Sequence, residues 1–234
     1  MVPLARKQSF DLAEDQAMDV YTLASGKSEG AVLLWHGSGP RERTVMSPLA
    51  ERVAAFGLTV YVPDWSSDAE DRGVADLLRS LDFVVDKTVG DPSATSRMVL
   101  AGWSAGASAA MAIALKGDQE RRPSAVVAIA GRYDGLGPLG EVSPMNMSTD
   151  PPSALTIRLV HGRSDEVVPD EQSELLFNSL SESGWACTLT LVDADHAGVI
   201  GCRYDEQRGL CVPSPDEGAG EVLRNVAALF DLRV

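Results

Sequence analysis

The chain has 234 residues, of which 44% are hydrophobic, so it can bury one sizeable core and is neither a disordered chain nor a small disulfide scaffold. The 34 Asp and Glu residues outnumber the 20 Lys and Arg residues, and the resulting net charge of −14 argues against nucleic acid or an anionic membrane as a partner. No apolar run approaches the roughly 18 residues of a membrane span, and the first residues lack the apolar core of a signal peptide. We therefore expect a soluble, cytoplasmic protein whose three cysteines, Cys187, Cys202 and Cys211, stay free rather than pairing as Cys202 with Cys211.

Short apolar runs alternate with helix-like segments along the chain. The segment at 19–23 and the run at 31–35 have the pattern of an antiparallel hairpin that leads into a sheet. Further runs have the length and branched composition of buried strands, at 58–62, 98–102, 125–130, 155–160 and 187–192. Helices are expected at 46–56, 69–88, 105–116, 171–183 and 216–231. This alternation predicts an α/β fold with a doubly wound, mostly parallel sheet and helices on both faces.

We expect one domain over residues 1–234, without a large cap domain. The longest stretch without periodicity is 131–154, which is rich in Gly, Pro and Ser and lies between two predicted strands. In a compact domain such a loop is usually functional, so we interpret it as a short lid or rim loop. The stretch 197–215 is equally irregular and precedes the last predicted helix.

The pentapeptide GWSAG at 102–106 lies directly between a predicted strand and an alanine-rich predicted helix. This placement is typical of a nucleophile elbow, in which a strained turn projects a serine hydroxyl above the sheet. Ser104 is therefore the candidate nucleophile. Gly102 and Gly106 are expected because side chains there would clash where the strand packs against the helix.

A serine hydroxyl needs a base to take its proton, and the chain has three histidines. In the doubly wound hydrolase arrangement the order along the chain is serine, acid, histidine. His161 and His196 follow Ser104, but only His196, in DADHAG, leaves room for an acid between itself and the serine. His196 is therefore the candidate base.

The candidate acid is Asp165, in HGRSDEVVP, because it lies in the turn after the predicted strand at 155–160. A carboxylate there can accept the imidazole proton, fix the tautomer and stabilise the imidazolium. The rival carboxylates are Glu166 and Asp170 nearby and Asp193 and Asp195 beside the histidine, and their positions make them weaker candidates than Asp165.

Backbone amides are expected to stabilise the oxyanion of a tetrahedral intermediate. AVLLWHGSGP at 31–40 provides a strand that ends in a glycine-rich turn ahead of the nucleophile. We expect the amides of Ser38 and of Ala105, the residue after the serine, to be the two donors. His36 would then shape this turn rather than act as a base.

Four side chains at strand ends are candidates for the rim of a substrate pocket: His36, Trp65, Trp103 and Arg132. For the tryptophans, packing under the loops is the simpler interpretation. Arg132 and Arg163 both follow strand exits and could hold a substrate that carries a carboxylate, although a solvated arginine is the commoner outcome.

With GWSAG, HGSG, HGRSDEVVP and DADHAG in this order, the sequence resembles the α/β-hydrolase superfamily from about residue 17 to 231. In size it is most similar to the dienelactone hydrolase-like and small serine carboxylesterase members. Dienelactone hydrolases proper carry a cysteine where this chain has Ser104, and the HGSG turn differs from the HGGG of the hormone-sensitive-lipase-type esterases. The resemblance implies hydrolysis of esters, thioesters, lactones or amides without a metal or organic cofactor.

These observations predict a serine hydrolase that cleaves carboxylic esters of small or exposed acyl groups, with a small-molecule ester as its partner. A thioesterase, lactonase or peptidase using the same three residues is the nearest alternative. A non-catalytic ligand-binding member of the fold is a second alternative, and it would normally have lost one of the three. A metal-dependent hydrolase is disfavoured, because three scattered histidines do not have the spacing of metal ligands.

Overall fold

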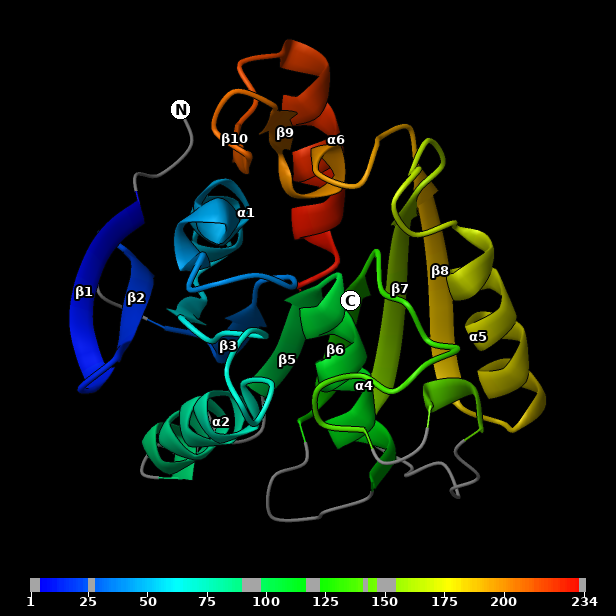
Figure 1. Ribbon diagram of the computed structural model, residues 1–234, viewed down its shortest axis with the longest axis horizontal. Helices are drawn as coiled ribbons and strands as arrows, with labels where there is room; N and C mark the ends of the chain where they lie inside the picture. Colours follow the sequence, from blue (N-terminus) through cyan, green and yellow to red (C-terminus); the bar gives the residue numbers. More distant parts are fainter. Residues whose placement is uncertain are drawn as a thin grey trace.

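An eight-stranded sheet in the order β1-β2-β4-β3-β5-β6-β7-β8 runs through the molecule (Figure 1). The structure, a computed structural model, describes residues 5–24, 28–89, 98–116, 123–140, 143–146 and 155–231. The strands of the sheet are β1 (Ala5–Ala13), β2 (Gln16–Leu23), β3 (Ala31–Trp35), β4 (Thr59–Pro63), β5 (Met98–Trp103), β6 (Ala125–Ile129), β7 (Thr156–Gly162) and β8 (Ala186–Val192). The helices are α1 (Ser47–Ala54), α2 (Val74–Val89), α4 (Ala105–Lys116), α5 (Glu171–Glu182) and α6 (Glu217–Ala228).

Strands β3 to β8 are parallel, and β2 is antiparallel to both of its neighbours, β1 and β4. The predicted doubly wound, mostly parallel sheet is thereby confirmed. The predicted hairpin between 19–23 and 31–35 is wrong, because Met18–Tyr21 lie opposite Val60–Pro63 and β3 lies between β4 and β5. The hairpin partner of β2 is β1, whose exposed and charged residues do not have the composition of a buried strand.

Helices cover both faces of the sheet and create two hydrophobic cores. Along β3, Val32 and Leu34 face the core that α1 and α6 complete. Leu33 and Trp35 face the other core, which α2, α4 and α5 complete. Helices α1 and α6 pack against each other on their side of the sheet (Figure 1). Within the described residues, no helix combines the length and apolarity needed to cross a membrane.

Helix α2 begins five residues later than predicted, at Val74. The reason is a turn over residues 69–73 in which Arg72 and Gly73 have φ values of 57° and 81°. The Asp71 carboxylate accepts hydrogen bonds from the amides of Gly73 (2.9 Å) and Ala75 (2.8 Å), so the helix is capped at this turn.

The stretch 197–215 is more ordered than predicted. It contains a 3-10 turn at Gly198–Ile200 and a separate two-stranded sheet of β9 (Cys202–Asp205) and β10 (Leu210–Pro213). Cys211 lies opposite Tyr204 and Cys202 lies opposite Pro213, and all three cysteines of the chain are free. The predicted rim loop at 131–154 falls partly outside the described residues, at 141–142 and 147–154.

Candidate active site

Ser104 lies in a sharp turn between β5 and α4 and has a φ of 56°, in the left-handed region that side chains rarely adopt. Its amide donates a hydrogen bond to Ile129 O (2.8 Å) in the neighbouring strand, which fixes the turn. A Cβ at Gly102 would lie 2.2 Å from Gly106 C, and one at Gly106 would lie 2.4 Å from His36 O. The expectation that close packing dictates these two glycines is confirmed.

Asp165 and His196 come together at the carboxyl ends of β7 and β8. His196 Nδ1 donates to Asp165 Oδ2 over 2.7 Å. The other carboxylate oxygen, Oδ1, accepts hydrogen bonds from the amides of Val167 (2.9 Å) and Val168 (2.8 Å). Burial alone would raise the pKa of Asp165, but the hydrogen bonds from the histidines and the Val168 amide hold that pKa well below its usual value. Asp165 is therefore a carboxylate aimed at one imidazole nitrogen.

A second histidine, His161, also contacts this carboxylate. Its side chain is fully buried, and its Nε2 donates to Val168 O (2.9 Å) and lies 3.2 Å from Asp165 Oδ2. Its Nδ1 is hydrogen-bonded to Ser173 Oγ (2.7 Å) on α5. His161 thus connects Asp165 to the helix that follows it and restricts how the carboxylate can rotate.

The loop that carries His196 is fixed to the residue before the candidate nucleophile. Trp103 Nε1 donates to His196 O over 2.8 Å, and the two rings lie 4.9 Å apart between centroids. Among the hydrogen bonds of the described chain, none joins Ser104 Oγ to His196. Catalytic hydrogen bonds are often long before substrate binds, and the Trp103 contacts keep the imidazole beside the serine turn.

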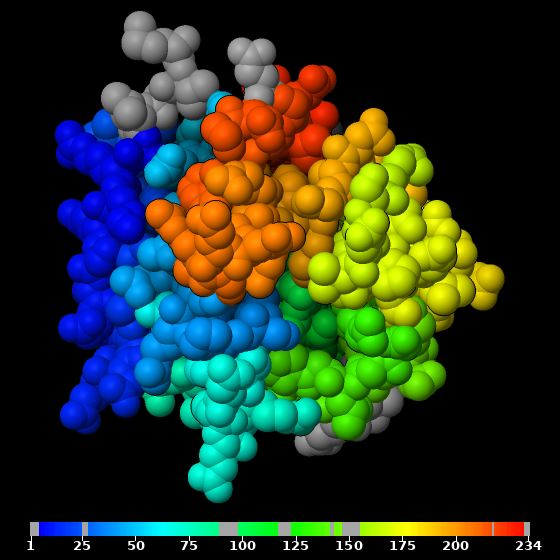
Figure 2. Space-filling view, turned by 45° about the horizontal axis from the view of Figure 1, so that its top comes forward, coloured from blue at the N-terminus to red at the C-terminus, as the bar shows by residue number. Residues whose placement is uncertain are grey.

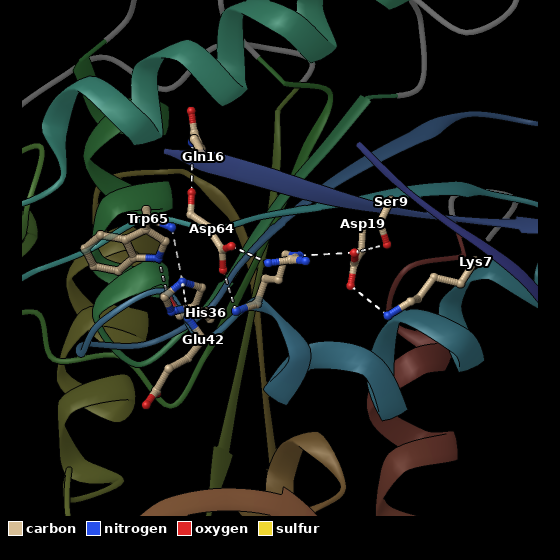
Figure 3. A network of polar contacts seen from close by, with 9 residues as sticks. Lys7, Ser9, Gln16, Asp19, His36, Glu42, Asp64 and Trp65 are labelled. Carbon is tan, nitrogen blue, oxygen red and sulfur yellow. Dashed lines mark hydrogen bonds and ion pairs between the residues drawn. The ribbon is translucent and has the colours of Figure 1, made fainter. Parts of the chain in front are cut away.

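The turn after β3, which carries the Ser38 amide, is held by a polar network (Figure 3). His36 is fully buried, its Nδ1 donates to Gly37 O (2.9 Å), and its Nε2 accepts from the amides of Trp65 (3.3 Å) and Glu42 (3.4 Å). Burial lowers the pKa of His36 to about 4, so this imidazole is neutral near pH 7.

The same network continues to the outer strands. Arg43 forms an ion pair with Asp64, at the end of β4, and another with Asp19 in β2, where Arg43 Nε lies 3.1 Å from Asp19 Oδ1. Asp19 is fully buried and also accepts hydrogen bonds from Lys7 (3.0 Å) and Ser9 (2.6 Å) in β1. The turn at 36–43 is therefore anchored to three strands.

Ser104 opens into a cavity of about 380 Å³. Its lining includes both residues expected to donate amides, two arginines and five residues of the predicted rim loop: Ser38, Ser67, Arg72, Ser104, Ala105, Ser108, Arg132, Gly135, Leu136, Gly137, Pro138, Val167 and Val168. Figure 2 shows this face, with the β9–β10 segment in orange beside the yellow-green segment near residue 165 and green atoms deeper between them. Ala105 is the first residue of α4, so its amide has no partner within the helix.

A second hollow, of about 400 Å³, lies on the His196 side. It is lined by Ser164, Glu166, Val167, Asp195, His196, Ala197, Tyr204 and Cys211. Val167 lines both hollows, so they meet near the Asp165 turn. The first hollow carries cationic side chains and the second carries carboxylates.

Of the four rim candidates from the sequence, one lines the Ser104 cavity and three are buried. Arg132 lines the Ser104 cavity. His36 and Trp65 do not lie at the rim, because both are fully buried, stacked with their ring centroids 5.3 Å apart. Trp103 is 6% exposed and packs beneath His196. Arg163 lies outside the cavity lining, with its Nε 3.8 Å from Asp193 Oδ1.

Sequence reasoning missed two residues of this site. His161 was considered only as a base and set aside in favour of His196, although its place before a glycine at a predicted strand exit indicated that it could lie at this edge of the sheet. Arg72 lies in a turn without a recognisable sequence motif, and its positive φ is visible only in the structure. Within the described ranges, no group of three or more His, Cys, Asp and Glu side chains is arranged to hold a metal ion.

The sequence matches the model of the alpha/beta hydrolase family over residues 32–210, and the chain belongs to that family. No curated protein matches it. Among solved structures, a truncated carbohydrate esterase from gut microbiota superposes with a TM-score of 0.70 at 16% identity, covering 98% of this chain and 96% of that one. Thermogutta terrifontis esterase 2 gives 0.69 at 17% identity (98% and 94%), and Pyrobaculum calidifontis esterase gives 0.70 at 14% (97% and 85%). At these identities the likeness is one of fold.

Proposed function

We propose that this protein is a serine hydrolase that cleaves carboxylic esters of small or exposed acyl groups. Ser104 is the nucleophile, His196 the general base and acid, and Asp165 the residue that orients His196. The observation that carries the proposal is the 2.7 Å hydrogen bond from His196 Nδ1 to the buried Asp165 carboxylate, in a loop fixed to the residue before a serine with a φ of 56°.

The first half-reaction forms an acyl-enzyme. Ser104 Oγ attacks the acyl carbon while His196 Nε2 takes the hydroxyl proton, and the negative charge develops on the former carbonyl oxygen. The amides of Ser38 and Ala105, which line the same cavity, are the proposed donors to that oxygen. His196 then gives its proton to the leaving alkoxide as the carbon–oxygen bond breaks.

The second half-reaction returns the free enzyme. Water enters, His196 removes one of its protons, and the hydroxide attacks the acyl carbon through a second tetrahedral intermediate. Collapse releases the carboxylic acid and the proton goes back to Ser104 Oγ. Asp165 stays ionised throughout the cycle. Burial alone would raise its pKa, but its hydrogen bonds hold the pKa well below its usual value.

Several features support an ester as the substrate. The neighbours named above are described as esterases, and the chain shares their fold over nearly its whole length. The cavity of about 380 Å³ is at the small end of ligand pockets, which fits a short acyl group.

Covalent labelling tests the assignment of the nucleophile. A fluorophosphonate probe should attach to one site, and peptide mass spectrometry should place it on Ser104. Ser104→Ala should remove the label, while Ser108→Ala, a substitution of a second serine in the cavity lining, should leave it in place. Labelling of the Ser104→Ala variant at the wild-type rate would contradict the proposal.

A further inference from the structure

Two arginines, Arg72 and Arg132, line the cavity that holds Ser104. Arg72 comes from the turn before α2, and Arg132 follows β6. Within the described chain, neither guanidinium has an ion pair or a side-chain hydrogen bond. Both side chains are exposed, and other exposed arginines such as Arg41 and Arg203 also lack an ion pair, so the distinguishing feature of this pair is its place at the Ser104 cavity. In a chain of net charge −14, two cations without a carboxylate partner at one cavity leave room for an external anion.

The backbone of Arg72 is a second and independent observation. Three non-glycine residues of the described chain have positive φ: Arg72 (57°), Ser104 (56°) and Ala130 (50°). Such a conformation is strained for a residue with a Cβ, and it persists where the surroundings fix it. Here the surroundings are the Asp71 cap and Gly73, where a Cβ would lie 2.5 Å from the Trp65 ring. The turn therefore holds an arginine where glycine would be less strained.

The placement of the other groups decides which half of an ester carries the anion. Ser104 and the proposed amide donors line the same cavity as the arginines, so this cavity receives the acyl half. His196 gives its proton to the leaving oxygen and lines the second hollow. Glu166 and Asp195 also line that hollow and would repel a negatively charged leaving group.

We propose that Arg72 and Arg132 form a carboxylate subsite, and that the substrates are monoesters of short dicarboxylic acids with an uncharged alcohol as the leaving group. The proposal rests on the proposed function and names the substrate class of that same site. Hydrolysis of such a monoester by water yields a dicarboxylate and a neutral alcohol. Guanidinium groups suit this role because they stay charged and can bind both carboxylate oxygens at once.

The test compares two ethyl esters of similar length, monoethyl glutarate, which is anionic, and ethyl pentanoate, which is neutral. We expect kcat/KM of the wild type to be about tenfold to a hundredfold higher for monoethyl glutarate, the size expected of a charge-assisted hydrogen bond. Arg72→Gln and Arg132→Gln should each lower this ratio, and the double variant should bring it close to one. Ionic strength of 0.5 M should also lower the ratio, by screening.

Arg163→Gln is the matched control, because it removes the same charge at the same edge of the sheet but outside the cavity lining. It should keep the wild-type ratio. A second measurement uses the wild type alone: free glutarate should inhibit hydrolysis of ethyl pentanoate competitively, and valerate at the same concentration should inhibit it far less. This readout decides the proposal even where an arginine variant fails to fold.

The outcomes separate the subsite from the proposed function. Equal kcat/KM for the two esters, both dependent on Ser104, would overturn the carboxylate subsite and leave the serine hydrolase assignment standing. A ratio that falls as much in Arg163→Gln as in Arg72→Gln would also overturn it, because net charge alone would then explain the preference. Turnover of both esters that survives Ser104→Ala would overturn the proposed function itself.

Discussion

Asp165 is the residue on which the orientation of His196 depends, because its Oδ2 accepts the Nδ1 hydrogen bond while two amides hold its Oδ1. Asp165→Asn should lower kcat by about 10³-fold to 10⁴-fold, since an amide there favours the wrong imidazole tautomer. Asp170→Asn is the control, because Asp170 lies five residues further on, before α5, and makes no side-chain hydrogen bond at the cap. Steady-state kinetics of both variants check this prediction, and equal losses would assign the orienting role elsewhere.

The acid limb of the pH profile should report a single proton. The hydrogen bonds that lower the pKa of Asp165 keep it ionised at any pH at which the protein is active, and His36 with a pKa of about 4 stays neutral. Since neither of these two groups changes its charge near neutral pH, a single catalytic base should account for the loss of activity on acidification, and log kcat/KM should reach a limiting slope of one on the acid side. A limiting slope of two would contradict this account.

At the residue scale, the order of three short motifs, each at the end of an apolar run, predicts Ser104, Asp165 and His196 as candidate site residues, and the structure joins two of them, Asp165 and His196, by a hydrogen bond. It could not find Arg72, because nothing in the local sequence reveals a left-handed backbone for a non-glycine residue. It offered His36 and Trp65 as rim candidates because both follow strands, beside the simpler interpretation that Trp65 packs under the loops and that His36 shapes the turn. Both are fully buried, because the loops fold over those strand ends.

The start of α4 packs against the end of β3 beside the serine turn, and this contact leaves no room for a side chain at Gly106. Gly106→Ala should lower the free energy of unfolding by about 3 kcal/mol or more, because the clash with the His36 carbonyl requires the helix or the turn after β3 to shift. Gly218→Ala, on α6 with open space around it, should be neutral or stabilising by about 0.5 to 1 kcal/mol. Urea unfolding followed by circular dichroism measures both, and a Gly106→Ala protein as stable as the wild type would show that α4 and the end of β3 are not close-packed.

At the scale of elements, the apolar runs predicted six strands and five helices close to their positions, because burial on both faces imposes a composition that the sequence displays. The pairing of β2 was predicted wrongly, since its partners are β1, which precedes it, and β4, which is separated from it by β3 and α1 along the chain. The strands β1, β9 and β10 were not predicted, because β1 is exposed and polar, β9 and β10 have only four residues each, and all of them pair locally through short turns.

The buried carboxylate of Asp19 makes the free energy of unfolding of the whole molecule depend on pH. Burial alone would raise its pKa, but hydrogen bonds from Ser9 and Lys7 and the Arg43 ion pair lower it below its ordinary value. A carboxyl with a lowered folded-state pKa contributes stability that is fully present above its unfolded pKa of about 3.9 and is lost as pH falls through the folded value. The free energy of unfolding should therefore be level near neutral pH and fall below about pH 4.

Asp19→Asn should reduce that dependence and should cost about 3 kcal/mol at pH 7, because it leaves Arg43 and Lys7 with one carboxylate fewer in a buried network. Asp15→Asn, in the exposed turn between β1 and β2, provides the same chemical change without burial and should shift stability by less than about 0.5 kcal/mol. Urea unfolding from pH 3 to pH 7 measures both variants. Identical pH profiles for the wild type and Asp19→Asn would contradict the role of this network.

At the scale of the whole molecule, the parallel strands bring the three motif loops and the turn after β3 to one edge of the sheet, although they are spread from residue 36 to residue 196. Hydrolysis of a 4-nitrophenyl ester series, from acetyl to dodecanoyl, by the wild type and the folded Ser104→Ala variant tests the central claim most directly. We predict turnover by the wild type that favours short chains and falls to the background rate in Ser104→Ala. Turnover that persists in Ser104→Ala, or none by the folded wild type at any chain length, would contradict the assignment of a serine esterase.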